Sequence, residues 1–504
     1  MSRILNECPI ERARGVKMLF NSVIFISIFL PVAVLGWYLL QKLENPAFAK
    51  AFMIGMSFWF YGYYNISYLW VLLVSLCFNY GVSALFEMDF TVNRRRSLLS
   101  LGILGNLGLL FYFKYFNFFI DNCNYFLHTD IRLEQIALPL GISFFTFQQL
   151  SFVVERFRRE APHYPVLDYG FFVCFFPQLI AGPIVLHSEL IPQLQERKNR
   201  RFSFGSFYDG LTLFILGLAK KALLADSLAV LVDVEYGNIA FLDTPSAWIV
   251  ICWYMMELYF DFSGYCDMAR GIAAMFGFWL PENFDSPFRA VSVKDFWRRW
   301  HMTLSRFLSR YIYFPLGGNR KGKARQCLNL LLVFLVSGLW HGANWTFVVW
   351  GLLHGLAMVF ETVFPKARFR FEWLNRLATL IFVTLTFSIF RSDSLEMAAL
   401  LWQKLFTAGN RGVLFGVCNT LNFAENYVVI KLLEMTAPGF LNWFYLLCMI
   451  LLSVLSLVLL HGVKAQQWIH KSGHATGGIL LMATLFTWSF ISLSQVSVFL
   501  YFNF

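Results

Sequence analysis

The sequence predicts an all-α polytopic membrane protein, and three observations support that fold class. Of the 504 residues, 58% are hydrophobic and 14% are charged, whereas soluble domains hold roughly 45–50% apolar and about 25% charged residues. The mean hydropathy is +0.58. Apolar segments of about the length that a helix needs to cross a bilayer recur from end to end. This composition argues against a soluble enzyme, a secreted disulfide scaffold and a disordered chain.

The apolar segments predict about twelve crossings. The expected spans are residues 18–40, 47–64, 66–87, 98–120, 136–154, 207–231, 246–265, 326–341, 345–362, 376–391, 440–462 and 476–499. Segment 169–191 is also apolar, but Pro177, Gly182 and Pro183 interrupt it and Pro192 follows it, so we expect re-entrant or interfacial helices there. Irregular backbone at that depth survives only where it is buried in protein or lines a watery cavity. The segment therefore points toward a functional site.

Basic clusters between the spans predict the orientation. Lys and Arg number 41 and Asp and Glu number 30, so the net charge is +11. In a membrane protein such an excess marks cytoplasmic loops in contact with anionic lipid, and we expect no nucleic-acid partner. Threading the spans between these clusters leaves both chain ends outside. One cluster at the start of the chain violates the rule, and it comprises Arg3, Arg12, Arg14 and Lys17.

An ionisable residue inside a span is a functional candidate, because inserting it costs about 2.5–3.5 kcal/mol. His341 lies in the Gly-rich stretch Ser337–Trp345, where an imidazole between two indoles could be held neutral and basic. The plainer interpretation is a core histidine bonded across a helix interface, but the Gly, Trp and Asn neighbours favour function. His354 would lie about 220° around a continuous helix from His341, so we assign it to packing.

The block 295–320 interleaves aromatic and basic residues. Such a pattern can stack nucleic-acid bases, but in a membrane protein it favours amphipathic interfacial helices. A third interpretation is a cationic mouth for a phosphate-rich donor such as coenzyme A. Charge alone does not separate the last two. The arginines of that mouth would be Arg298, Arg299, Arg306, Arg310 and Arg320.

Two carboxylates and the last six residues also stand out. Glu257 and Asp261 are one helical turn apart, so they could act as acid and base or bind a cation, but pairing with the Arg-rich block is the plainer role. The nine cysteines form no C-x-x-C pair, so no metal site is expected.

The end of the chain, Phe499–Phe504, holds four aromatic residues. By itself this pattern is typical of an interfacial aromatic belt.

Taken together, ordered motifs from Met18 to Phe504 resemble the bacterial membrane-bound O-acyltransferase family, in its alginate O-acetyltransferase-like branch, with the membrane protein of teichoic-acid D-alanylation more distant. The resemblance rests on residues 18–22, 138–148, 176–183, 259–265, 283–287, 296–305, 313–319 and 338–344.

The resemblance implies a helical bundle with a central tunnel, which a cytoplasmic acyl thioester and an outer acceptor enter from opposite ends. The family's catalytic histidine falls on His341 and its second histidine on His301. Members of this branch end in an aromatic motif with a central Tyr, matched here by Tyr501, and this overturns the belt interpretation of the tail. Trp340 and Asn344 would shape the pocket. The tyrosine is expected to carry the acyl group briefly, for a separate extracytoplasmic SGNH-type partner.

Residues 1–17 depart from the family, whose members usually begin near Met18. We expect either that translation starts at Met18 or that the extension is particular to this chain. The expected organisation is this extension, a transmembrane domain over residues 18–499, and a tail over 500–504 that continues the motif from Phe499.

The sequence thus predicts an acyltransferase of the bacterial cytoplasmic (inner) membrane that O-acylates an extracellular polysaccharide through its partner. The donor would be acetyl-coenzyme A or an acyl carrier protein thioester, with no metal. Two alternatives stay open: a lipid or protein O-acyltransferase of the same fold, and a non-catalytic glycan transporter. The acceptor polymer, the acyl group and the donor's carrier do not follow from the sequence.

Overall fold

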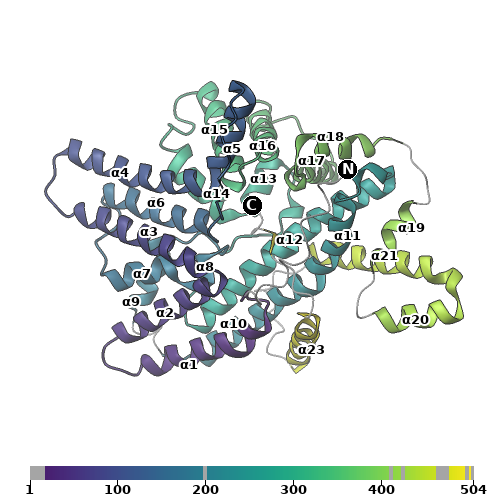
Figure 1. The fold of residues 1–504 in the computed structure, drawn as a ribbon, viewed down its shortest axis with the longest axis horizontal. Coiled ribbons are helices and arrows are strands. Elements are labelled where there is room, and N and C mark those ends of the chain that lie inside the picture. Colours follow the sequence, from purple (N-terminus) through teal and green to yellow (C-terminus); the bar gives the residue numbers. More distant parts are fainter. Residues whose placement is uncertain are drawn as a thin grey trace.

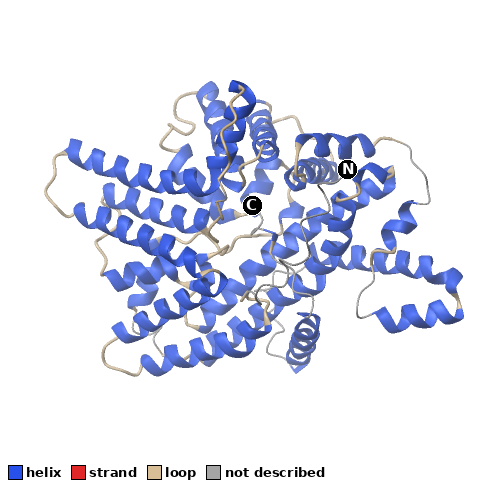
Figure 2. Cartoon of the chain, in the orientation of Figure 1, coloured by secondary structure: helices blue, strands red, loops and turns tan. Residues whose placement is uncertain are grey.

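The computed structural model describes residues 18–134, 136–196, 201–407, 413–421, 426–460, 476–493 and 499–500. Within these ranges the chain is helical and contains no strand (Figure 2), as the sequence predicts. The expectation about residues 1–17 lies outside the described residues.

The helices follow one another with short connections. The first part of the chain forms α1 (Leu30–Leu40), α2 (Ala47–Tyr64), α3 (Ile66–Leu85), α4 (Val92–Leu110), α5 (Phe116–Leu127), α6 (Ile142–Phe157), α7 (Val166–Cys174), α8 (Phe176–Leu179) and α9 (His187–Gln195). The middle forms α10 (Phe204–Ala219), α11 (Asp226–Tyr236), α12 (Thr244–Met275), α13 (Val293–Arg299), α14 (Met302–Leu308), α15 (Lys323–His341) and α16 (Trp345–Val363). The last part forms α17 (Glu372–Arg391), α18 (Leu395–Lys404), α19 (Val413–Cys418), α20 (Tyr427–Thr436), α21 (Leu441–Leu460) and α23 (Thr476–Ser492).

Five helical stretches of the described chain are long and apolar enough to cross a membrane, which makes this a multi-pass membrane protein. They are Ile66–Leu85, Val92–Leu127, Trp345–Val363, Glu372–Arg391 and Pro438–Leu460. Two shorter apolar helices cover Phe25–Leu40 and Thr476–Ser492. On α3 the side chains of Ile66, Trp70 and Val74 recur every fourth residue and are more than three-fifths exposed. An apolar stripe of this kind suits lipid rather than water.

Helix α12 runs through the middle of the molecule, with α1–α4 and α6–α9 on one side and α17–α21 on the other (Figure 1). It is buried over almost its whole length, which is why it can carry acidic residues inside a membrane protein. Close packing against α10 depends on glycine, because a Cβ on Gly217 would lie 2.6 Å from the carbonyl oxygen of Gly264.

The segment expected to be re-entrant is broken as its prolines predict. Residues 166–195 form three short helices, α7, α8 and α9, and the chain between α8 and α9 is irregular. Gly182 to Leu186 are nonetheless buried in protein, the condition under which such backbone is tolerated at depth.

The described residues contain four π-helical turns, and two of them join consecutive numbered helices and carry a lysine. One, Phe111–Tyr115, joins α4 to α5, and the other, Lys220–Ala225, joins α10 to α11. A π turn inserts an extra residue into the helix and is frequent at functional sites. The first turn contains Lys114, which is partly buried, and the second contains Lys221, which is fully buried.

Candidate active site

His341 is the last residue of α15. The helix ends there because Gly342 adopts an extended backbone, and Asn344 then caps α16 by accepting a hydrogen bond from the Thr346 N–H at 3.1 Å. His341 is 5% exposed. The Gly-rich stretch therefore makes a tight corner between two antiparallel helices, with the imidazole at the corner.

Glycine lets α15 and α16 touch at this corner. A Cβ on Gly338 would lie 2.3 Å from the carbonyl oxygen of Phe347, and one on Gly351 would lie 2.4 Å from that of Phe334. Real atoms do not approach so closely, so any larger residue would push the two helices apart. The two glycines thus determine how far His341 reaches into the protein.

His301 lies between α13 and α14 and is fully buried. Its φ of 44° is in the left-handed region, where a residue without glycine's freedom is strained. Asn283 holds the ring, because its Oδ1 lies 3.1 Å from Nδ1 and also accepts from the N–H and O–H of Thr303, at 3.2 and 2.9 Å. An oxygen in that position requires the proton on Nδ1, which leaves a lone pair on Nε2. Burial lowers the pKa of His301 to about 3, so the ring is neutral at pH 7.

The two histidines that the sequence singled out come together. Their ring centroids are 6.4 Å apart, although the residues are 40 positions apart in the chain. The two buried imidazoles therefore belong to one site. The arrangement suits general acid–base chemistry, in which an imidazole within hydrogen-bond reach takes or gives the proton.

A cavity of about 50 Å³ opens onto His341. Polar groups in its lining include Lys114 and Ser143, while Tyr64 and Trp340 contribute aromatic rings. The cavity is large enough for water or a small chemical group but not for a larger ligand.

Lys114 reaches from its π turn to the end of α15. Its ammonium donates hydrogen bonds to the carbonyl oxygens of Trp340 and His341, at 2.6 and 3.0 Å, and lies 3.3 Å from the hydroxyl of Ser143. Its neighbour Tyr115 donates to the carbonyl of Leu339 at 2.8 Å. The last carbonyls of a helix have no partner within the helix, and a cation is favourable at this end. Lys114 thus caps the helix that presents His341.

Aromatic rings enclose His341, but they are only partly the ones expected. Trp340 packs against it at 4.9 Å between ring centroids, whereas Trp345 is half exposed and donates to Asn122. The second indole is instead Trp350, whose ring lies 5.2 Å from the imidazole, with Phe390 at the same distance. The expected pair of indoles exists, with a different second member.

His354 lies on α16 and not on the same helix as His341, so the angle around one continuous helix does not apply. It accepts a hydrogen bond from the indole N–H of Trp297 at 3.2 Å, and its Nε2 lies 3.0 Å from the hydroxyl of Thr386. It is fully buried. These contacts fit the packing role that the sequence predicts.

Asn344, Arg298 and Arg299, which the sequence assigned to substrate binding, differ in their contacts. Asn344 caps α16 and donates to the carbonyl of Asp393 at 2.8 Å. Arg299 pairs with Asp295 one turn away, at 3.1 Å. Arg298 is exposed. Their roles in binding substrate remain predictions.

Arg306 forms a two-pronged ion pair with Glu189, at 2.5 and 2.9 Å, and also donates to the carbonyl of Ile184. It therefore ties α14 to the broken segment. Arg310 pairs with Glu155 and Glu160, both at 2.8 Å. Three of the five arginines of the expected mouth, Arg299, Arg306 and Arg310, are thus held by carboxylates.

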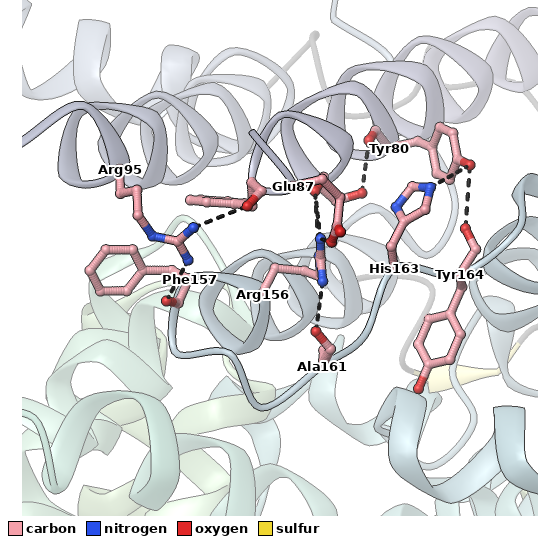
Figure 3. A network of polar contacts seen from close by, with 10 residues as sticks. Tyr80, Glu87, Arg95, Arg156, Phe157, Ala161, His163 and Tyr164 are labelled. Carbon is pink, nitrogen blue, oxygen red and sulfur yellow. Dashed lines mark hydrogen bonds and ion pairs between the residues drawn. The ribbon is translucent and has the colours of Figure 1, made fainter. Parts of the chain in front are cut away.

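A second set of arginines gathers where α3, α4 and α6 meet (Figure 3). Arg95 donates to the carbonyls of Phe86 and Phe157, and Arg156 pairs with Glu87 and donates to the carbonyl of Ala161. This set borders a cavity of about 540 Å³. Arg95 and Arg156 belong to two of the basic clusters between the expected spans, and these two clusters thus lie together.

Asp261 does not pair with the Arg-rich block, contrary to the plainer expectation. Its carboxylate lies 2.5 Å from the ammonium of Lys221 and accepts the N–H of Leu500 at 3.0 Å. The reason is topological, because α10 and not the block 295–320 packs along this face of α12. Within the described residues, no group of three His, Cys, Asp or Glu side chains could hold a metal ion.

The expected tail is described only at its start. Phe499 and Leu500 are buried, at 1% and 9% exposure. Tyr501, the expected acyl carrier, lies outside the described residues.

Sequence reasoning missed Lys114, Asn283 and Trp350. Lys114 had a usable signal, since it is a lysine inside the predicted span 98–120 and therefore costly unless it has a function or partners. Asn283 lies in the motif 283–287, but nothing in the sequence pairs it with His301. Trp350 reaches His341 only because α16 folds back beside α15.

Comparisons with known proteins identify the family. The model of the membrane-bound O-acyltransferase family matches residues 53–392, which include both histidines. A peptidoglycan O-acetyltransferase of Helicobacter pylori is 38% identical over 97% of this chain and 98% of its own. A protein of Pseudomonas aeruginosa named as a probable alginate O-acetylase is 34% identical over 78% of this chain and 75% of its own. A teichoic acid D-alanyltransferase of Bacillus subtilis is 28% identical over 49% of this chain and 65% of its own. The chain belongs to the membrane-bound O-acyltransferase family and is an acyltransferase.

Proposed function

We propose that this chain moves an acetyl group from a cytoplasmic thioester across the bacterial inner membrane, for O-acetylation of a polysaccharide outside. The observation that carries the proposal is the buried pair His301 and His341, whose ring centroids are 6.4 Å apart and of which His341 lines a cavity. These are the two histidines that the resemblance to the family singles out. The names of the relatives support a polysaccharide acceptor. Likeness over nearly the whole of both chains favours peptidoglycan.

His341 acts as the general base. A neutral phenol is a poor nucleophile, since tyrosine has a pKa near 10 in water. As the Tyr501 oxygen attacks the thioester carbonyl, His341 takes the phenolic proton. The tetrahedral intermediate then collapses, the carbon–sulfur bond breaks, and the leaving thiolate receives the proton from the imidazolium. The products are a tyrosyl acetate and a free thiol.

His301 assists from the other side of the reacting group. Because Asn283 holds the proton on Nδ1, the Nε2 of His301 offers a lone pair. It can therefore accept a hydrogen bond from a reactant and orient it, and it does not donate. Trp340 and its aromatic neighbours exclude water, which protects the thioester from hydrolysis.

The donor is acetyl-coenzyme A or an acyl carrier protein thioester, which approaches on the cytoplasmic side and is guided by Arg298, Arg299 and Arg306. The acceptor side needs a partner, because the sequence of this chain has no G-x-S-x-G motif. An SGNH-type extracytoplasmic protein takes the acetyl group from the tyrosyl ester onto its serine and passes it to the polysaccharide. An aryl ester is activated, so this relay needs no ATP outside.

Intact-mass analysis and peptide mapping test the proposal. Purified protein is incubated with radiolabelled acetyl-coenzyme A, and the wild type is compared with His341→Ala and Tyr501→Phe. We expect one acetyl group on Tyr501, absent from both variants. Labelled carrier protein is the second donor to try.

The alternatives predict other outcomes. Acetyl transfer to lipid or to another protein, with Tyr501 dispensable, would favour a lipid or protein O-acyltransferase. Absence of any thioester consumption with either donor would overturn the enzymatic proposal in favour of a glycan transporter.

A further inference from the structure

The π turn between α10 and α11 carries a buried ionic group. The ammonium of Lys221 lies 2.5 Å from Asp261 and 2.8 Å from Asp226, and the side chains of Lys221 and Asp261 are each 2% exposed. Charges this deep are stable only when they are paired and hydrogen-bonded. One ammonium cannot neutralise two carboxylates, so the group retains an excess of hydrogen-bond acceptors.

The start of the C-terminal tail supplies what this group lacks. The N–H of Leu500 donates to the second oxygen of Asp261 at 3.0 Å. The ring of Phe499 lies 4.7 Å from the Lys221 ammonium and meets the ring of Tyr265 edge-on at 4.6 Å. Two adjacent tail residues therefore satisfy the carboxylate and the ammonium separately, one through its backbone and one through its aromatic face.

This contact lies next to the candidate active site. Phe262 follows Asp261 on α12, and its ring packs edge-on against His301 at 4.8 Å. Residue 501 begins one peptide unit, about 3.8 Å between Cα atoms, beyond Leu500. The hydrogen bond at Leu500 consequently fixes the point from which Tyr501 extends.

We infer that Lys221, Asp261 and Asp226 form a receptor for the chain's own aromatic C-terminus, in which Asp261 is a positioning residue that sets the register of the tail. This inference deepens the proposed function, since it assigns the residues that present the acyl-carrying tyrosine. A neighbouring ion pair provides a comparison. Lys220 and Asp267 are 2.6 Å apart on the same two elements, with Asp267 six residues further along α12 than Asp261.

Hydrogen–deuterium exchange on the full-length protein in lipid nanodiscs tests the receptor without any donor present. The measurement follows the C-terminal peptides and uses α16 as an internal reference for folding. In Asp261→Asn we expect the tail amides to exchange at least about tenfold faster, because a hydrogen bond to a charged group is lost. Asp267→Asn is the matched control and should leave tail exchange unchanged.

A change on the tail itself leaves the residues of α12 and of the π turn as they are. Phe499→Leu keeps an apolar side chain but removes the cation–π contact, so tail exchange should rise about two- to fivefold. Unchanged tail exchange in both Asp261→Asn and Phe499→Leu, with α16 still protected, would overturn the inference. Equal acceleration by Asp267→Asn would overturn it as well, because the effect would then be general loosening of α12.

Activity measurements separate this inference from the relay. If both hold, Asp261→Asn lowers acetylation of Tyr501 while the chemical groups around His341 are unchanged. If the relay is wrong, tail exchange still responds to Asp261→Asn, but no label appears on Tyr501 in the wild type either.

Discussion

Two buried histidines, His341 and His187, show how differently the protein uses the same side chain. Both are at most 5% exposed. The Nε2 of His187 lies 2.5 Å from the Glu155 carboxylate, and its Nδ1 lies 2.9 Å from the hydroxyl of Tyr164. His341 instead lies among aromatic rings, with a second histidine nearby and a cavity beside it. Burial alone therefore does not identify a catalytic histidine.

The difference extends to the charges around each residue. Glu155 binds His187, Arg310 and Tyr311 together, so the surroundings of His187 form a closed set of ion pairs and hydrogen bonds. Near His341 the cation Lys114 bonds to backbone carbonyls. Charges near His187 join helices to one another, whereas the cation near His341 fixes one helix end and leaves the imidazole facing the cavity.

The largest effects are expected for two single substitutions, one at each of these histidines. His341→Ala should lower acetyl transfer by about 10²–10⁴, the range that a positioned general base contributes, without lowering the melting temperature much. His187→Ala should do the opposite and destabilise by about 1–3 kcal/mol, because Glu155 loses a partner while buried. Turnover per folded molecule and thermal melting of detergent-purified protein measure both. A large loss of turnover in folded His187→Ala would contradict this division.

A smaller effect is expected at the helix end. Lys114→Met should lower turnover by about 10- to 100-fold, because displacement of a catalytic group by about 1 Å costs that much. The KM for the donor should change little, since Lys114 holds the α15 carbonyls. Tyr115→Phe is the matched control, because it removes one hydrogen bond to the same helix but not the bond to the His341 carbonyl. Equal losses in the two variants would argue against a special role for Lys114.

The hydrogen bond that orients His301 should contribute less. In Asn283→Ala, turnover should fall about tenfold, as expected for one lost hydrogen bond. Steady-state kinetics with acetyl-coenzyme A measure this. His301→Ala in the same background provides the test: if Asn283 acts through His301, the double variant should lose no more than His301→Ala alone.

The arginines should give the smallest effects. Arg298 is exposed, so Arg298→Ala should raise the KM for the donor only about two- to fourfold, in line with the weak attraction between solvated charges. The effect should fade in high salt. Arg376→Ala, at another exposed arginine, is the control. A salt-independent change in kcat would show that Arg298 contacts the reacting groups directly.

How much of the site could be predicted differs from residue to residue. His341 and His301 could be chosen as candidate site residues because each lies in a short motif that can be recognised in the sequence alone. The broken segment 169–191 was predictable from its prolines. The partner of Asp261 was not, since Lys221 and Leu500 lie 40 and 239 positions away, and local patterning favoured the nearby arginines. Trp350 was missed for the same reason, because the corner at Gly342 folds α16 back beside α15.

The sequence by itself determined the class of the protein, the helical segments and the two histidines, because apolar composition and short motifs act locally. Only the tertiary structure decided which groups surround them. Three features depend on contacts between segments that are separated in the chain. They are the capping of α15 by Lys114, the hydrogen bond that leaves a lone pair on His301, and the hydrogen bond between the tail and Asp261. Buried polar groups must find partners wherever packing brings them, and packing is a property of the whole bundle.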